Sequence, residues 1–167
     1  ATLTILPPAE PIAKPTYASA FGSYGGAQGQ FRSPGDVAVD LHGDLWVADK
    51  ANNRVQKFDS TGKFLAAYGS LGSANGQFNR PSAIAVDPEG DILIADSNNH
   101  RVQKLSPTGA FISKFGAFGS ANGQLNKPEG IAVDGAGNIW VADTQNGRVQ
   151  RFSEAGEFLA VLDSGQL

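Results

Sequence analysis

The stretch that decides the fold is residues 78–116, which read FNRPSAIAVDPEGDILIADSNNHRVQKLSPTGAFISKFG. It holds four short apolar runs, separated by three turn signals rich in Asp, Asn, Ser, Pro and Gly. Short apolar runs bounded by such residues are typical of β-strands joined by tight turns. The stretch therefore predicts one small antiparallel sheet of four strands.

The same pattern occurs once before this stretch and once after it. Phe31 precedes Phe78 by 47 positions, and Leu125 follows Phe78 by another 47. A fixed period in this range, with four strands per unit, is the sequence signature of a β-propeller blade. We therefore predict an all-β propeller with three four-stranded blades per chain, at about 31–68, 78–115 and 125–162.

The N-terminal part of the chain departs from this repeat. Residues 17–22 match residues 64–69 at the same offset of 47, which predicts an extra outer strand ahead of the first blade. Residues 1–16 contain four prolines, which favour an extended strap over a helix or a central strand. The predicted organisation is a strap at 1–16 and a propeller region at 17–167.

Composition limits the classes of partner. The chain has 167 residues, a formal net charge of −3 and a pI of about 5.3, so it lacks the basic excess that nucleic-acid binding favours. No run of apolar residues is long enough to predict a membrane span. Because there are no cysteines, disulfides and cysteine–zinc sites are excluded.

The strands differ in their polarity patterns. The second strand of each unit is apolar at successive positions, as in 92–95, which predicts that both of its faces are covered by neighbouring blades. The fourth strand alternates, as in 111–115, which is typical of an outer strand with one buried face. Trp46 and Trp140 stand in second strands, where we expect them to pack between blades.

Three motifs in the repeat give a family resemblance. Residues 81–87 read Pro-x-x-Ile-Ala-Val-Asp, the second strand ends Ile-Ala-Asp at 94–96, and Asn99-His100-Arg101 follows. These motifs resemble the NHL repeat, and the resemblance covers residues 17–162. It implies a β-propeller. NHL propellers include RNA-binding regions, an amidating lyase, sensor domains and bacterial extracellular proteins, so the fold does not select one function.

The number of blades raises a problem of closure. Propellers have about four to eight blades, so three blades leave an open arc with two bare, apolar blade faces. Two chains forming a six-bladed ring, a chain that is a piece of a longer propeller, and an arc capped by a different protein are the three solutions. The sequence leads us to favour a homodimer, although the extra strand at 17–21 competes with the fourth strand of the last blade.

Acidic and basic residues recur at fixed positions in every unit. We interpret the pairs Asp49–Arg54, Asp96–Arg101 and Asp143–Arg148 as structural, inter-blade contacts, because a site for one ligand rarely repeats in each blade. Polar residues near the starts of the first strands and after the second strands predict a partner-binding rim. Its candidate members are Arg32, Lys50, Asn52, Arg80, His100, Lys127 and Gln145.

No motif of known chemistry is present. His42 and His100 are the only histidines, and their turns predict that they lie at opposite rims. No catalytic, cofactor-binding or metal-binding residue is therefore predicted. The sequence favours a non-enzymatic interaction or assembly scaffold, extracellular or in a bacterial cell envelope, with a second copy of itself as the partner. The alternatives are an RNA-binding propeller and a metal-dependent, lyase-like propeller enzyme.

Overall fold

A computed structural model describes residues 18–162, and the predicted strap at 1–16 lies outside them. This part of the chain forms three four-stranded antiparallel sheets, each with its strands in sequence order. The first sheet contains β3 (Pro34–Val39), β4 (Leu45–Asp49), β5 (Arg54–Phe58) and β6 (Phe64–Tyr68). The second contains β7 (Pro81–Val86), β8 (Ile92–Asp96), β9 (Arg101–Leu105) and β10 (Phe111–Phe115). The third contains β11 (Gly130–Val133), β12 (Ile139–Asp143), β13 (Arg148–Phe152) and β14 (Phe158–Leu162).

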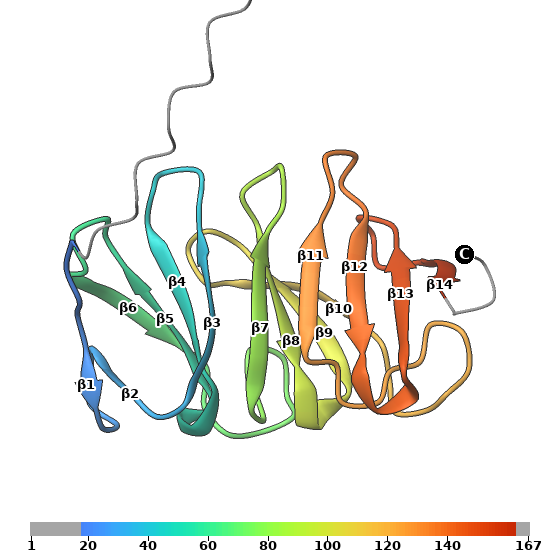
Figure 1. Cartoon of the computed structure of the whole chain (residues 1–167), viewed down its shortest axis with the longest axis horizontal. Helices are drawn as coiled ribbons and strands as arrows, with labels where there is room; N and C mark the ends of the chain where they lie inside the picture. The colour runs from blue at the N-terminus through green and yellow to red at the C-terminus, as the bar shows by residue number, and fades with distance from the viewer. Residues whose placement is uncertain (1–17, 163–167) are drawn as a thin grey trace, which may run out of the picture.

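The three sheets stand side by side as blades 1, 2 and 3 (Figure 1). The first strand of each blade contacts the first strand of the next, β3 with β7 and β7 with β11, so these are the inner strands. Blades of sequential antiparallel strands packed face to face define a β-propeller arrangement. The predicted fold class, an all-β propeller with three four-stranded blades, is confirmed.

The turn between the first and second strands is fixed by one aspartate. The Asp40 Oδ1 atom accepts hydrogen bonds from the backbone N–H groups of His42 and Asp44, at 2.9 and 3.0 Å. Gly43 supplies the left-handed position of this turn, with φ of +84°. Asp87 and Asp134 make the equivalent bonds in the other blades.

A short 3₁₀ turn follows each second strand. The three turns are η1 (Lys50–Asn52), η2 (Ser97–Asn99) and η3 (Thr144–Asn146). Each ends on a left-handed residue, which is Asn53, His100 or Gly147. Because β3, β7 and β11 run antiparallel to the strands before these turns, the inner strands begin at the same end of the blades. We call this end the axial end.

The hydrophobic core lies between the blades. One cluster joins blades 1 and 2 through fully buried side chains that include Trp46, Phe78 and Ile94. A second cluster joins blades 2 and 3 and includes Leu93, Leu125 and Phe152. All five residues of β8 are buried, as expected for the second strand of a blade that has neighbours on both sides.

The N-terminal outer strand differs from expectation within the described residues. Residues 18–22 are not assigned to a strand, and the next elements are the short parallel pair β1 (Ser23–Tyr24) and β2 (Gln30–Phe31). An outer strand needs a third strand to pair with, and the described chain provides none ahead of blade 1. Within residues 18–162, no helix is long and apolar enough to cross a membrane.

Candidate functional site at the axial end

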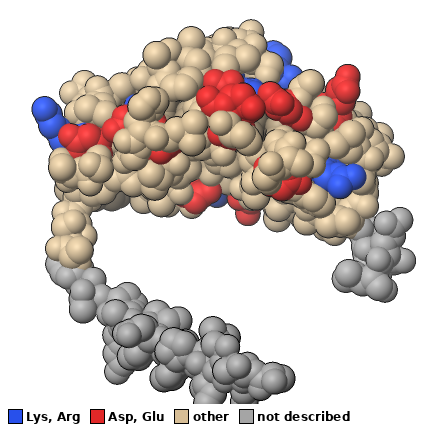
Figure 2. Space-filling view, turned by 90° about the horizontal axis from the view of Figure 1, so that it is seen from above, with Lys and Arg blue, Asp and Glu red and all other residues tan. Residues whose placement is uncertain are grey.

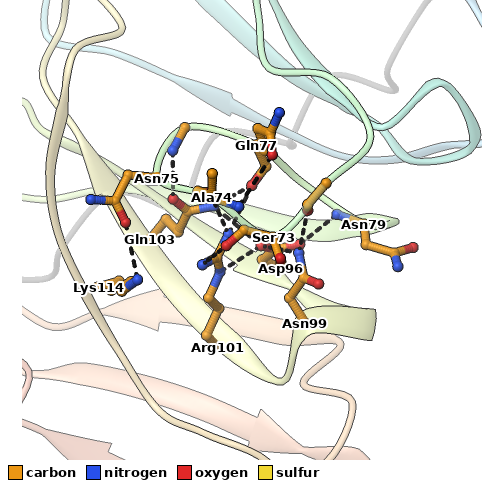
Figure 3. Close-up of polar contacts among 12 residues, drawn as sticks. Ser73, Ala74, Asn75, Gln77, Asn79, Asp96, Asn99, Arg101, Gln103 and Lys114 are labelled. Atoms are coloured by element: carbon orange, nitrogen blue, oxygen red, sulfur yellow. Dashed lines mark hydrogen bonds and ion pairs between the residues drawn. The ribbon is translucent and has the colours of Figure 1, made fainter.

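The predicted Asp–Arg pairs form buried knots that join blade to linker. The side chain of Asp96 is fully buried, and its Oδ2 atom lies 2.8 Å from Arg101 Nε (Figure 3). The Arg101 guanidinium also donates to the carbonyl oxygens of Ser73, Ala74 and Gln77, which lie in the linker from blade 1. The knot therefore anchors the inter-blade linker on blade 2.

The other two blades carry the same knot. Arg54 Nε lies 2.8 Å from Asp49 Oδ2, and Arg148 Nε lies 2.7 Å from Asp143 Oδ2. A glutamine on the third strand joins each knot; Gln56 Nε2, for example, donates to Asp49 Oδ2. Because protein donors fill these carboxylates in all three blades, the knots hold the linkers in place and offer no ligand site.

The predicted rim residues all belong to segments at the axial end, but they do not act as one group. Asn52 is part of the Asp49 knot and donates to the Gly25 carbonyl, so its side chain is occupied. Arg32, Arg80, Lys127 and Gln145 are exposed. The Arg32 guanidinium lies over the Tyr24 ring, 5.6 Å from the ring centroid.

His100 connects two neighbouring rim loops. Its Nδ1 atom accepts a hydrogen bond of 3.1 Å from the backbone N–H of Lys127, and its ring lies edge-on to Phe118. Burial, with a smaller contribution from the Lys127 charge, lowers the pKa of His100 below its ordinary value of 6.5. The neutral imidazole therefore acts as a loop-to-loop contact. Asn53 does the same one blade earlier, because its Oδ1 atom accepts from the Arg80 N–H.

Four polar side chains that sequence reasoning missed or placed elsewhere form a non-repeating set at the axial end. We call Asp36, Lys50, Ser82 and Glu129 the axial cluster. Asp36 Oδ2 on β3 accepts from the Ile84 N–H on β7, at 3.1 Å. Ser82 Oγ on β7 donates to the Pro128 carbonyl just before β11, at 2.9 Å. Both side chains therefore join inner strands of adjacent blades.

Lys50 and Glu129 connect blades that are not neighbours. Lys50 directly follows the second strand of blade 1, and Glu129 directly precedes the first strand of blade 3. The Lys50 Nζ atom lies 3.7 Å from Glu129 Oε1. The side-chain exposures are 23% and 51%, so this ion pair remains open to solvent and to a small molecule. Of the four residues, only Lys50 was among the predicted rim residues.

A signal for this cluster was present in the sequence. Asp36 aligns with Ala83 and Gly130 of the other blades. Glu129 aligns with Gly35 and Ser82. Lys50 aligns with Ser97 and Thr144. Comparing the inner-strand positions of the three blades for residues that break the repeat would have identified the cluster. The predicted rim, which consists mainly of loop residues, included only Lys50.

The two ends of the blades differ in charge. Figure 2 looks onto the end opposite the axial end, where acidic side chains gather and few basic ones are visible. The hairpins at that end hold His42 and the acidic residues Asp40, Asp44, Asp87, Glu89, Asp91 and Asp134. His42 and His100 therefore lie at opposite ends and cannot share a ligand within one chain.

Residues 18–162 contain no group of three or more His, Cys, Asp or Glu side chains that could hold a metal ion. Asp36 and Glu129 are the carboxylates of the axial cluster, and the Oδ atoms of Asp36 already accept from the N–H groups of Val37 and Ile84. The described residues alone therefore do not fit a metal centre.

The blades and their axial cluster define the chain as part of a β-propeller. Residues 18–166 match the SMP-30/gluconolactonase/LRE-like region, and the chain belongs to this family. Sequence relatives cover less of it. The chain is 44% identical to Protein brain tumor of Drosophila melanogaster over 63 residues, which are 36% of this chain and 6% of that protein.

Solved structures with the same fold include two lyases. A streptogramin B lyase matches with a TM-score of 0.59 at 22% identity, covering 74% of this chain and 38% of that one. Virginiamycin B lyase from Staphylococcus aureus matches with a TM-score of 0.63 at 19% identity, covering 81% and 42%. The chain thus spans less than half the length of these relatives. At such identities the likeness shows the fold alone.

The family corrects two predictions. The sequence led us to expect an interaction or assembly scaffold without enzymatic activity. The family match instead groups this chain with gluconolactonase-type propellers. Both predictions were wrong, because the lack of linear catalytic motifs says little about a propeller, whose site is assembled from separate blades. The enzyme-like alternative is the one that the family supports. The extracellular or envelope location and the absence of nucleic-acid binding stay predictions.

Proposed function

We propose that this chain is part of an enzyme-type propeller that opens lactone rings at its axial end. The observation that carries the proposal is the family match, which covers all of the described residues and names gluconolactonase. A lactone is a cyclic ester, so its opening requires activation of water and stabilisation of a developing negative charge.

The axial cluster offers groups of the right kind for this chemistry. A carboxylate such as Glu129 can accept a proton from water, and an ammonium such as Lys50 can stabilise an oxyanion. The Lys50 and Glu129 side chains are 23% and 51% exposed, and neither residue recurs at its position in the other blades. A reaction centre needs such single-copy groups, whereas the repeated Asp–Arg knots serve the fold.

Metal dependence is not part of the proposal. Residues 18–162 do not supply a metal-binding set, so any metal would need ligands from outside those residues. The steps assigned here, proton acceptance and charge stabilisation, belong to Glu129 and Lys50 alone.

We also infer that the repeats are of the NHL kind within this wider family. The support is the Asn99-His100-Arg101 motif, in which His100 takes the left-handed position that ends η2 and Arg101 enters the knot.

The test is a pH-stat assay of lactone opening by the purified chain, with glucono-δ-lactone and a panel of simpler lactones as substrates. Glu129→Gln should lower kcat/KM by roughly 100-fold or more, the usual range for removing a general base. Lys63→Ala, on an exposed turn at the opposite end, is the control and should leave the rate unchanged. Equal rates for Glu129→Gln and the parent, or no opening of any lactone, would contradict the proposal.

A further inference from the structure

Within residues 18–162, no neighbouring blade covers the two outermost blade faces. In blade 2, Ile84 packs against blade 1 and is 3% exposed, whereas its equivalent in blade 1, Val37, is 56% exposed. Val39 on the same side of blade 1 is 58% exposed, whereas its equivalent Val86 packs against the core between blades 1 and 2. We call this side of blade 1 the leading face. It is an apolar surface whose counterparts in blades 2 and 3 are covered.

Blade 3 also exposes apolar side chains, on the side that faces away from blade 2. We call this side the trailing face. Trp46 on the trailing side of blade 1 is fully buried against blade 2, but its equivalent Trp140 is only partly buried. Leu162 on the same side is 49% exposed. In addition, Arg151 Nε is buried and has no hydrogen-bond partner within the described residues, and the guanidinium lies over the Trp140 ring.

The linker before blade 1 shows that this blade is built to follow another. A Cβ on Gly62 would lie 2.8 Å from the Phe21 ring, just as a Cβ on Gly156 would lie 2.6 Å from the Phe115 ring of the preceding blade. Phe21 therefore contacts blade 1 in the same way that Phe115, the last residue of the outer strand β10, contacts blade 3. The chain enters blade 1 as it enters its later blades, although residues 18–162 contain no earlier blade.

We propose that the trailing face of a second copy of this chain covers the leading face, so that two copies close one six-bladed ring. The faces match because the chain already joins equivalent faces twice, between blades 1 and 2 and between blades 2 and 3. Propellers have about four to eight blades, and six is the only multiple of three in that range. Two copies related by a two-fold axis then form two identical interfaces.

Charge complementarity supports the same occupant. Between blades 2 and 3, Lys104 Nζ lies 3.9 Å from Glu154 Oε1 on the turn of the next blade. Arg151 is the equivalent of Lys104, and the equivalent turn of blade 1 carries Asp59 and Ser60. Ring closure therefore brings an acidic turn to the guanidinium of Arg151, whose Nε atom has no hydrogen-bond partner within the described residues.

Ring closure requires one segment to move. Leu162 is the equivalent of Phe115. In the ring, Leu162 of the second copy would pack against Gly62, where Phe21 lies in the single chain. β14 is held by its ladder with β13, whereas residues 18–22 are not part of any strand. The N-terminal segment is therefore the one displaced, and Phe21 covers the site only in the single chain.

The experiment is sedimentation equilibrium of the full chain and of matched variants, and it needs no substrate. The parent should sediment at twice its chain mass of 17.4 kDa. Val37→Glu should weaken dimerisation by about 100-fold or more, because closure would bury an unpaired carboxylate. Val37 is exposed in the single chain, so circular dichroism should show an unchanged fold.

Leu65→Glu is the control, because Leu65 is 45% exposed on the outer strand β6, away from both faces, and this variant should remain a dimer. A parent that stays monomeric at its highest soluble concentration would overturn the inference, and further blades or another protein would then cover the faces. So would a dimer that Val37→Glu leaves intact. A dimer without lactonase activity would instead refute the proposed function and leave the ring standing.

Discussion

At the residue scale, Asp96 shows how a buried charge can hold two blades together. Its carboxylate is fully buried and accepts from the Asn79 N–H at 2.7 Å and from the side chains of Asn99, Arg101 and Gln103 at 2.8–3.1 Å. A buried carboxylate is tolerated only when its oxygens are satisfied by donors of this kind. Removing one charged partner leaves a desolvation cost that the remaining neutral donors only partly offset.

The first prediction concerns that partner. Arg101→Ala should lower the free energy of unfolding by about 3 kcal/mol, because it leaves the Asp96 charge without its cation and frees three linker carbonyls. Urea denaturation measures this change. Arg80→Ala is the matched control, since the Arg80 side chain is exposed, and its midpoint should match that of the parent. An Arg101→Ala midpoint equal to that of the parent would show that the knot does not stabilise the fold.

The choice of functional residues also belongs to this scale. The sequence indicated the Asp–Arg pairs because they recur, and the structure places each pair in contact. It did not indicate Asp36, Ser82 or Glu129, because contacts between different blades depend on how the blades fan around the axis. Lys50 was predicted as a rim residue, but its pairing with Glu129 follows only from the three-dimensional arrangement.

At the element scale, the β3–β4 hairpin depends on the ionised form of Asp40. Burial opposes ionisation, but hydrogen bonds from Trp46, Lys57 and two backbone N–H groups outweigh it and lower the pKa of Asp40 from 3.8 to about 2. A depressed folded-state pKa means that the charged carboxylate stabilises the fold above the unfolded-state pKa. This stabilisation is lost as the pH falls through the folded-state pKa.

The second prediction follows from this sign. Between about pH 4 and pH 2, the parent should lose up to about 2 kcal/mol of stability through Asp40. Asp40→Asn should be less stable than the parent near neutral pH, and its stability should fall less over that window. Thermal melts across the pH range measure the difference, with Glu157→Gln, at an exposed position, as the control. Parallel pH profiles for Asp40→Asn and the parent would contradict the hydrogen-bonding account.

The strands could be predicted from the sequence because several local signals indicate the same strand boundaries. Each blade combines apolar runs, an Asp-containing turn and a glycine at positive φ, and all three recur at a spacing of 47. The outer strand expected at 17–21 did not form in the described part of it, because strand formation needs a hydrogen-bonding neighbour and local pattern cannot provide one. The same limit explains why the sequence alone left several solutions for ring closure.

At the scale of the whole molecule, three blades give an arc with two different apolar faces. The faces are equivalents of surfaces that already pack against each other inside the chain, so they are complementary to each other and not to themselves. A head-to-tail contact of this kind either closes into a ring or continues as an open filament. The proposed six-bladed ring is the closed outcome, and it would bring a second axial cluster to the same axis.

The most direct measurement of this claim uses the absence of cysteines from the chain. Ala132 lies on the trailing face, because it is the equivalent of Ala38, which packs against the core between blades 1 and 2. Val37→Cys on the leading face and Ala132→Cys, placed together in one chain, should be joined between copies by a short bis-maleimide. Leu65→Cys with Ala132→Cys is the control, and it should give no such product. A closed ring predicts covalent dimers and nothing larger on a denaturing gel. A ladder of higher oligomers, or no cross-linking by the Val37→Cys and Ala132→Cys pair, would contradict the ring.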